Sequence, residues 1–285
     1  MTAWAHGVAF ERGRAGAAPL LFARTLLAAM VVGASVSLAP PAGAGIVFTA
    51  TTTAESPTLR LVWIANTTVR GWIDGDRGKI EFLESRNEAT PRGSLLLTND
   101  GGKTVRLFDP ARKTCRPYFA NVGAVPRAKL PAGAAATFEK FMVEKTLEEA
   151  GPSIAGLPTR HYRFAIRYGT VMPATKDTGR LHTEKTHDIW VTPELTDAAI
   201  AIWLSTDVSS IGSEELDRKV SEAIAQVRGA ALRRVTVSKT QAEGRPVETL
   251  TTTFEVTNLE PEKQIQASTF AEPFPCKVLS PEDRR

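Results

Sequence analysis

The chain has 285 residues, of which 42% are hydrophobic and 23% are charged, and its formal net charge at pH 7 is +4. This length can bury a core as one large domain or two small ones. Because no dense basic stripe with interleaved aromatic residues accompanies the small positive charge, the composition does not predict a nucleic-acid-binding protein.

The first 44 residues have the three-part pattern of a secretory signal peptide. Arg12, Arg14 and Arg24 make the start basic, an apolar run covers residues 25–40, and small residues at 42–44 precede a cleavage site. An N-terminal membrane anchor is the alternative, but the apolar run is short for a spanning helix and rich in small residues. We therefore expect a periplasmic or secreted protein that has no stable membrane span after cleavage.

After this segment, apolar and polar residues alternate over short stretches separated by Asn, Asp, Gly and Pro. A period of two predicts strands, and these turn residues predict tight connections between antiparallel neighbours. An Ala-, Pro- and Gly-rich stretch without a period, at 123–136, predicts a loop. The strands predicted before this loop are 45–53, 59–65, 68–74, 79–85, 94–98, 103–109 and 112–119.

The stretch NDGGKT at 99–104 ends in Gly-Lys-Thr, as a phosphate-binding P-loop does. A P-loop needs another Gly five positions before the Gly of its Gly-Lys pair, and Leu97 occupies that position. It also needs a helix afterwards, whereas the alternation over 103–109 predicts a strand. Asp-Gly and Gly-Gly accept positive φ angles, so the stretch predicts a hairpin turn.

One helix is predicted clearly in the second half of the chain. It starts at Ser213, a suitable N-cap, carries an apolar stripe at helical spacing up to Val227, and closes at Gly229. Residues 137–150 fit either a helical turn or a strand. Further strands are predicted at 159–168, 186–195, 231–240 and 247–259. Strands interrupted by few helices indicate a single α+β domain over 45–275, followed by a tail at 276–285.

No set of residues predicts catalysis, a cofactor or a metal. Ser153 lies in a stretch with one residue too many for a G-x-S-x-G elbow. On a strand His182 and His187 point to opposite faces, so a metal site there needs an irregular loop, and the alternative is exposed strand ends. His161 is expected at the surface. The acidic residues form no pair suited to general acid and base catalysis.

The two cysteines, Cys115 and Cys276, are expected to form a disulfide in an oxidising compartment. Two separate buried thiols are the alternative.

Aromatic residues are frequent in the predicted strands. Alternate residues of a strand share a face, so these side chains can line a groove for an apolar ligand; the alternative is that they fill the core. The residues of this predicted ligand lining are Trp63, Trp72, Phe82, Phe108, Tyr162 and Trp190.

Several stretches together resemble secreted bacterial proteins that are grouped with the LolA/LolB-like outer-membrane lipoprotein carriers. They are LLTNDGGKTVRLFDPARKT at 96–114, IAGLPTRHYRF at 154–164, HDIWVTPEL at 187–195, RGAALRRVTV at 228–237, TTFEVTNLE at 252–260 and ASTFAEP at 267–273. The resemblance implies a curved, incomplete antiparallel β-barrel with one long and one or two short helices over its open side. In that family the concave space holds acyl chains, a related branch recognises mislocalised lipoproteins, and no catalytic residues are implied.

Two hypotheses follow. The first is an exported, non-catalytic binding protein whose ligand is a lipid, a lipoprotein acyl chain or another hydrophobic component of the cell envelope. The alternative is a structural or sensory envelope module that acts through protein–protein contacts. Neither hypothesis includes a cofactor or a nucleic-acid partner.

Overall fold

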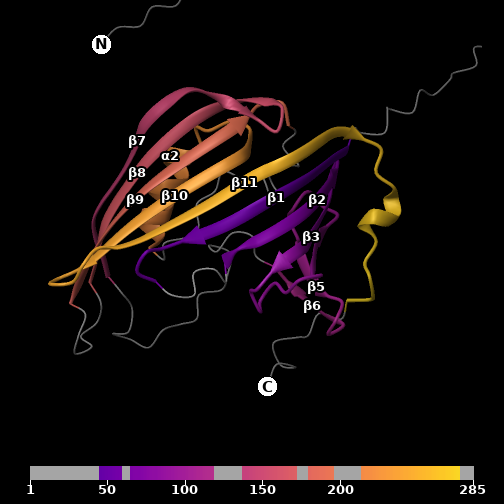
Figure 1. Ribbon diagram of the computed structural model, residues 1–285, viewed down its shortest axis with the longest axis horizontal. Coiled ribbons are helices and arrows are strands. Elements are labelled where there is room, and N and C mark those ends of the chain that lie inside the picture. The colour runs from indigo at the N-terminus through magenta and orange to yellow at the C-terminus, as the bar shows by residue number, and fades with distance from the viewer. Residues whose placement is uncertain (1–44, 60–64, 119–136, 172–178, 196–212, 277–285) are drawn as a thin grey trace, which may run out of the picture. The chain divides into compact units, whose positions relative to one another are not determined.

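The computed structural model describes residues 45–59, 65–118, 137–171, 179–195 and 213–276 (Figure 1). The chain divides into two units, Met1–Ala39 and Pro40–Arg285, and every described residue belongs to the second. The predicted signal peptide, most of the predicted strand at 59–65 and the predicted loop at 123–136 lie outside the described residues. Within the described ranges, no helix is long and apolar enough to cross a membrane.

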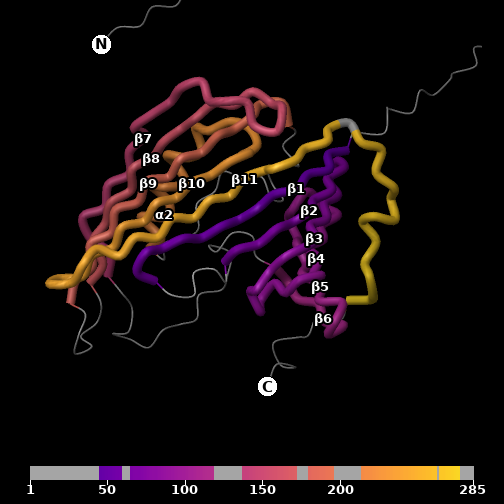
Figure 2. The backbone as a smooth tube through the Cα atoms, viewed as in Figure 1, coloured from indigo at the N-terminus to yellow at the C-terminus, as the bar shows by residue number. Residues whose placement is uncertain are grey.

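The described strands form one 11-stranded antiparallel sheet in the order β6-β5-β4-β3-β2-β1-β11-β10-β9-β8-β7 (Figures 1 and 2). The pairing of β1 with β11 joins the two series of sequential neighbours. The edge strands β6 and β7 do not pair with each other in the described part of the chain, so this sheet is open. The strands are β1 Gly45–Glu55, β2 Thr67–Asp74, β3 Arg77–Ser85, β4 Leu95–Thr98, β5 Arg106–Asp109, β6 Thr114–Pro117, β7 Thr137–Ile154, β8 Leu157–Val171, β9 Arg180–Thr192, β10 Ala230–Ala242 and β11 Glu248–Lys263.

The register of the ladders defines two faces of the sheet, because directly opposed residues of antiparallel strands lie on the same face. Tyr162, Ile189, Arg234 and Phe254 oppose one another in turn from β8 to β11. We call the face that carries these four residues the helix face. The opposite face is called the strap face.

Buried apolar side chains gather in two clusters. Cluster 1 contains Phe48 of β1, Phe82 of β3 and Val256 of β11, which lie on the helix face. Cluster 2 contains Phe164 of β8 and Ile189 of β9, together with the buried side of the helix α2. The strand residues named here from both clusters thus lie on the same face of one sheet, and Trp190 of the opposite face also packs against cluster 1.

The helix α2, Glu214–Ile224, confirms the predicted apolar stripe and its N-cap. The Ser213 side chain accepts a hydrogen bond from the backbone N–H of Leu216, and Leu216 is fully buried in cluster 2. The predicted end at Gly229 is wrong, because the helix ends at Ile224. Gly229 precedes β10 and has a φ of +118°. A Cβ atom at this position would collide with the backbone of Thr192. A short 3-10 helix, η3, Ala267–Phe270, follows β11.

Pairing with neighbouring strands decides the secondary structure of two other segments. Residues 137–150, which fitted a helix or a strand, belong to the 18-residue strand β7, which pairs with β8 along its length with three register shifts. The strand predicted to start at residue 186 starts at Arg180, because β8 and β10 provide partners for the preceding residues.

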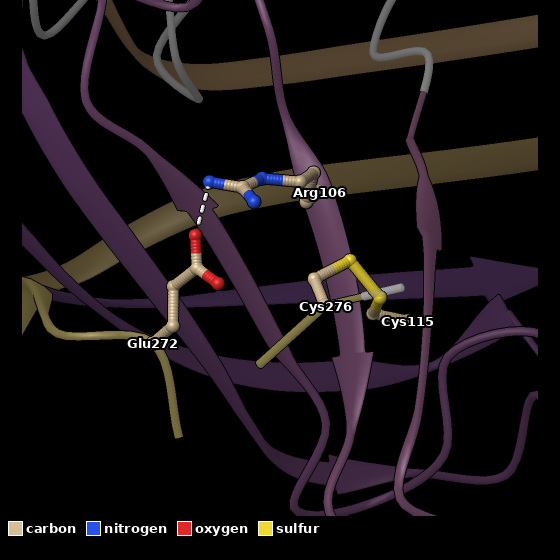
Figure 3. The surroundings of a disulfide bond; sticks show 4 residues. All are labelled: Arg106, Cys115, Glu272 and Cys276. Atoms are coloured by element: carbon tan, nitrogen blue, oxygen red, sulfur yellow. Dashed lines mark ion pairs between the residues drawn. A yellow bond between two sulfur atoms is a disulfide. The ribbon is translucent and has the colours of Figure 1, made fainter. Parts of the chain in front are cut away.

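Residues 264–276 follow β11, and we call them the C-terminal strap because they are tied to the strap face of β3–β6. Figure 3 shows two of its attachments, the disulfide between Cys276 and Cys115 of β6 and the ion pair between Glu272 and Arg106 of β5. The Cα atoms of the two cysteines are 5.7 Å apart. The ring of Phe274 packs edge-on against Phe108, with 5.5 Å between ring centroids.

Candidate functional site

The NDGGKT stretch is a turn that is closed by its own side chains. It joins β4 to β5, with φ angles of +70° at Gly101 and +85° at Gly102, as predicted for a hairpin. The Asp100 carboxylate accepts hydrogen bonds from the backbone N–H of Thr104, at 2.9 Å, and from its hydroxyl, at 2.5 Å. These bonds lower the pKa of Asp100. The N–H of Gly101 donates to the Asp76 carbonyl, so this loop does not present a row of backbone donors to a phosphate.

The serine candidate lies on β7, and the two histidines of the HTEKTHD stretch lie on β9. The Ser153 hydroxyl donates to the Leu157 carbonyl at 3.1 Å. On β9, His182 is exposed and His187 is buried, on opposite faces as expected. The interpretation of this stretch as exposed strand ends is wrong, because it lies inside β9, with Thr183, His187 and Asp188 buried.

The prediction of a surface position for His161 is also wrong. This side chain is 7% exposed on the strap face, stacked on Trp190 with 4.3 Å between ring centroids. Its Nε2 lies 2.6 Å from Asp188 and its Nδ1 lies 3.2 Å from Glu149. Since carboxylates occupy both ring nitrogens, neither is free to take a proton from a substrate, and we assign His161 a structural role.

His161 belongs to a continuous cross-strand row on the strap face. Arg233 lies over the Trp190 ring at 5.0 Å and forms an ion pair with Glu255 at 3.8 Å. Cross-strand pairs of this kind stabilise the register of a sheet. From β7 to β3 the row contains Glu149, His161, Trp190, Arg233, Glu255, Thr51, Thr68 and Glu84.

A polar cavity of about 370 Å³ lies at the ends of β1, β2 and β3. Its lining contains one carboxylate and one guanidinium group but no aromatic ring and no buried charged side chain. The lining residues are Thr51, Thr52, Thr53, Asn66, Thr67, Thr68, Glu84, Ser85 and Arg86. Such a set provides many hydrogen-bonding groups but no large apolar side chain for a lipid.

The predicted aromatic lining is divided between the two faces, so its five described members do not form one groove. Alternation along the strands and the register between them place Phe82 and Tyr162 on the helix face, in clusters 1 and 2. They place Trp72, Phe108 and Trp190 on the strap face. Trp63 lies outside the described residues.

The three strap-face aromatics have other partners. Trp72 is half-buried, with Arg70 at 5.3 Å and Lys79 at 5.0 Å from its ring. Phe108 is fully buried beside the strap. These contacts give the strap-face rings partners within the protein, so the rings are accounted for without a ligand.

The helix face also carries three basic side chains where clusters 1 and 2 meet, and we call Lys185, His187 and Arg234 the basic group. Lys185 Nζ lies 5.8 Å from the ring centroid of Tyr168, in cluster 2. Arg234 Cζ lies 4.6 Å from the ring centroid of Phe254, in cluster 1.

The basic group is held in surroundings of low polarity. His187 is 3% exposed, and its Nδ1 lies 2.7 Å from the Thr236 hydroxyl. Burial lowers the pKa of Lys185, and the charge of Asp217 on α2 opposes this shift. Burial raises the pKa of the neighbouring Tyr168. Sequence patterns did not predict this group, because the pairing of β9 with β10 brings Arg234 near Lys185 and His187, and that pairing cannot be read from either strand alone.

No protein-family model matches the chain, and no curated protein matches it. The described residues include no group of three or more His, Cys, Asp or Glu side chains that could hold a metal ion. The apolar helix face with its basic group is therefore the best candidate for a functional site.

Proposed function

We propose that this chain is an exported, non-catalytic binding protein that holds a lipid or another hydrophobic envelope component on the helix face of its sheet. The observation that carries the proposal is the continuity of clusters 1 and 2 on one face of an open sheet. The helix α2 contributes to cluster 2, and cluster 1 is built from strands and the residues at their ends. The helix α2 packs on cluster 2, and we propose that an acyl chain packs on cluster 1 beside it.

The energy for such binding comes from the transfer of apolar surface out of water. Each buried methylene group contributes about 0.8 kcal/mol, so roughly ten of them contribute up to about 8 kcal/mol. The loss of translational and rotational freedom on association offsets part of this energy. The remainder suits reversible binding of a carried ligand and requires no chemical step.

Export and the family resemblance support the same proposal. The signal-like segment and the disulfide agree with an oxidising compartment outside the cytoplasm. The open antiparallel sheet with a helix on one face agrees with the incomplete barrel that the resemblance to the LolA/LolB-like carriers implies. We propose that the described sheet is such a half-barrel, with its concave side at the helix face.

The proposal is tested with protein purified gently from an exporting host. Native mass spectrometry should detect a co-purified lipid, and the delipidated protein should take up one fluorescent acyl probe per chain, which unlabelled fatty acid displaces. Absence of both co-purified lipid and probe uptake contradicts the proposal.

Two matched variants locate the binding surface. Phe254→Ala removes an aromatic ring from the helix face and should weaken probe binding at least severalfold. Trp72→Ala removes one from the strap face and should leave the affinity unchanged. Binding is measured below the thermal unfolding transition of each variant. Equal effects of the two substitutions contradict the assignment of the ligand to the helix face.

The alternative proposal, an envelope module that acts through protein contacts, relies on the edge strand β7, which has no second partner in the described sheet. Its three register shifts and its many Glu and Lys residues are features that oppose the addition of a further strand. A stable complex with an envelope protein, purified without lipid, is the result that favours this alternative.

A further inference from the structure

We propose that the polar cavity at the ends of β1, β2 and β3 binds a ligand that carries several hydroxyl groups and has the size of a sugar ring. Binding of such a ligand does not depend on whether the helix face holds a lipid.

Three neighbouring strands supply the lining of this cavity. Its residues, 51–53, 66–68 and 84–86, belong to β1, β2 and β3 or directly adjoin them. Thr52 opposes Thr67 in the register of β1 with β2. The Cβ atoms of directly opposed residues are about 4.5–5.5 Å apart, so side chains from two strands can contact one small ligand. The volume of about 370 Å³ also lies within the range of roughly 300–1,000 Å³ that is usual for small-molecule sites.

Four threonine hydroxyls of the lining make no hydrogen bond to the described part of the chain. They belong to Thr51, Thr52, Thr53 and Thr67, and all of these side chains except that of Thr53 are half-buried. Hydroxyls without a protein partner hydrogen-bond to water. A ligand displaces such water without loss only if its own groups replace the hydrogen bonds. A sugar ring offers several hydroxyls for this exchange, whereas an apolar ligand offers none.

Two further groups of the lining favour a ligand that both donates and accepts hydrogen bonds. One oxygen of Glu84 accepts from the Thr68 hydroxyl at 3.2 Å, and no donor among the described residues is hydrogen-bonded to the other oxygen. The Asn66 side-chain oxygen accepts from the Ala54 N–H at 2.7 Å, so its amide N–H₂ points away from that bond and can donate. A carboxylate only accepts and an amide N–H₂ only donates, and a hydroxyl can pair with either group.

The test is an NMR titration of the ¹⁵N-labelled protein, followed at the backbone amides of residues 51–53, 66–68 and 84–86. The ligands are glucose, galactose, mannose, xylose and myo-inositol. Hydrogen bonds between neutral groups contribute little net energy, so we expect at least one of these ligands to bind with a dissociation constant on the order of 1 mM. Cyclohexanol, cyclohexylammonium and cyclohexanecarboxylate are ring-sized comparisons with one hydroxyl, one positive and one negative group, and each should bind several-fold more weakly.

Matched variants assign the binding to the threonine hydroxyls. Valine has the branched shape of threonine without the hydroxyl, and neighbouring residues of a strand point to opposite faces. At least one of Thr51→Val and Thr52→Val should therefore weaken binding several-fold. Thr186→Val is the control, because Thr186 is also half-buried but lies on β9, outside the lining.

The outcomes separate this site from the proposed function. If no sugar or inositol shifts the lining amides, the site is wrong, whatever the acyl probe shows. Equal or tighter binding of cyclohexanol or of either charged ring also overturns it, because several hydroxyl groups are then not what the cavity selects. An effect of Thr186→Val as large as that of both lining variants, or no effect of either lining variant, overturns the assignment to these hydroxyls. Failure of the acyl probe alone overturns the lipid proposal and leaves the polar site standing.

Discussion

Removal of the disulfide is the perturbation whose effect on stability follows most directly from the structure. Cys115 and Cys276 are 161 positions apart, so their bond closes most of the domain into one loop in the unfolded state. In the chain-entropy model a loop of this length contributes about 5 kcal/mol to the free energy of unfolding. Domains typically have about 5–15 kcal/mol in total, so this bond is a large part of the stability.

The strap should remain docked in the folded state of the double variant Cys115→Ser/Cys276→Ser. The Phe108–Phe274 ring pair contributes about 0.5–1.5 kcal/mol, and the half-exposed Arg106–Glu272 ion pair contributes at most about 1 kcal/mol. Phe270, only 4% exposed, adds about 1.5–3 kcal/mol from its burial. The variant should therefore fold, with most of its loss of stability arising from the unfolded state.

The assay is urea denaturation of the oxidised protein, the reduced protein and the double variant. We expect the free energy of unfolding to fall by about 3–5 kcal/mol in both states that lack the disulfide, with a larger dependence on urea because the unfolded chain is less compact. A loss below about 1 kcal/mol in the double variant would refute the reasoning, since it would mean that the bond does not constrain the unfolded chain. Agreement between the reduced protein and the double variant is the control.

Three further predictions concern single residues. His161→Ala should lower the free energy of unfolding by about 1–3 kcal/mol in urea because it removes the buried hydrogen bond to Asp188 and the stacking on Trp190. Exposed His182→Ala should change it by less than about 0.5 kcal/mol, and equal effects of the two substitutions contradict the structural role of His161. Gly229→Ala should lower the stability by about 2 kcal/mol or more, because the φ of +118° is unfavourable for alanine and its Cβ would clash with the Thr192 backbone. Gly244→Ala, at a φ of +71° with open space around it, should lower the stability by about 1 kcal/mol. Thermal melts that rank the two variants in the opposite order contradict the steric argument. Asp100→Asn should remove a stabilisation that depends on pH, because folding lowers the pKa of Asp100. The wild-type protein should be more stable than the variant by the full amount above pH about 4, the ordinary pKa of a carboxyl, and this difference should disappear as the pH falls through the pKa of Asp100 in the folded protein. A difference in stability that is the same at pH 7 and pH 2 contradicts this prediction.

Local patterns in the sequence determined most of the elements. Alternation of period two and turn residues predicted the strands from Thr67 to Pro117, because a strand's side-chain period and the positive φ of an Asp-Gly turn are properties of a few neighbouring residues. Leu97 excluded a P-loop, and the Asp-Gly and Gly-Gly turn residues correctly predicted a hairpin. Ser213 marked the start of the helix, since N-capping is also a local interaction.

The tertiary structure decided which side chains meet. His161 is buried because Glu149 and Asp188, on two other strands, occupy its ring nitrogens, and no pattern around His161 specifies those partners. The predicted aromatic lining was divided because the face of each ring depends on the register between strands, and a shift of one residue reverses that face. The same long-range register brings Arg234 beside His187, 47 positions earlier in the chain, which is why only the folded sheet reveals the basic group.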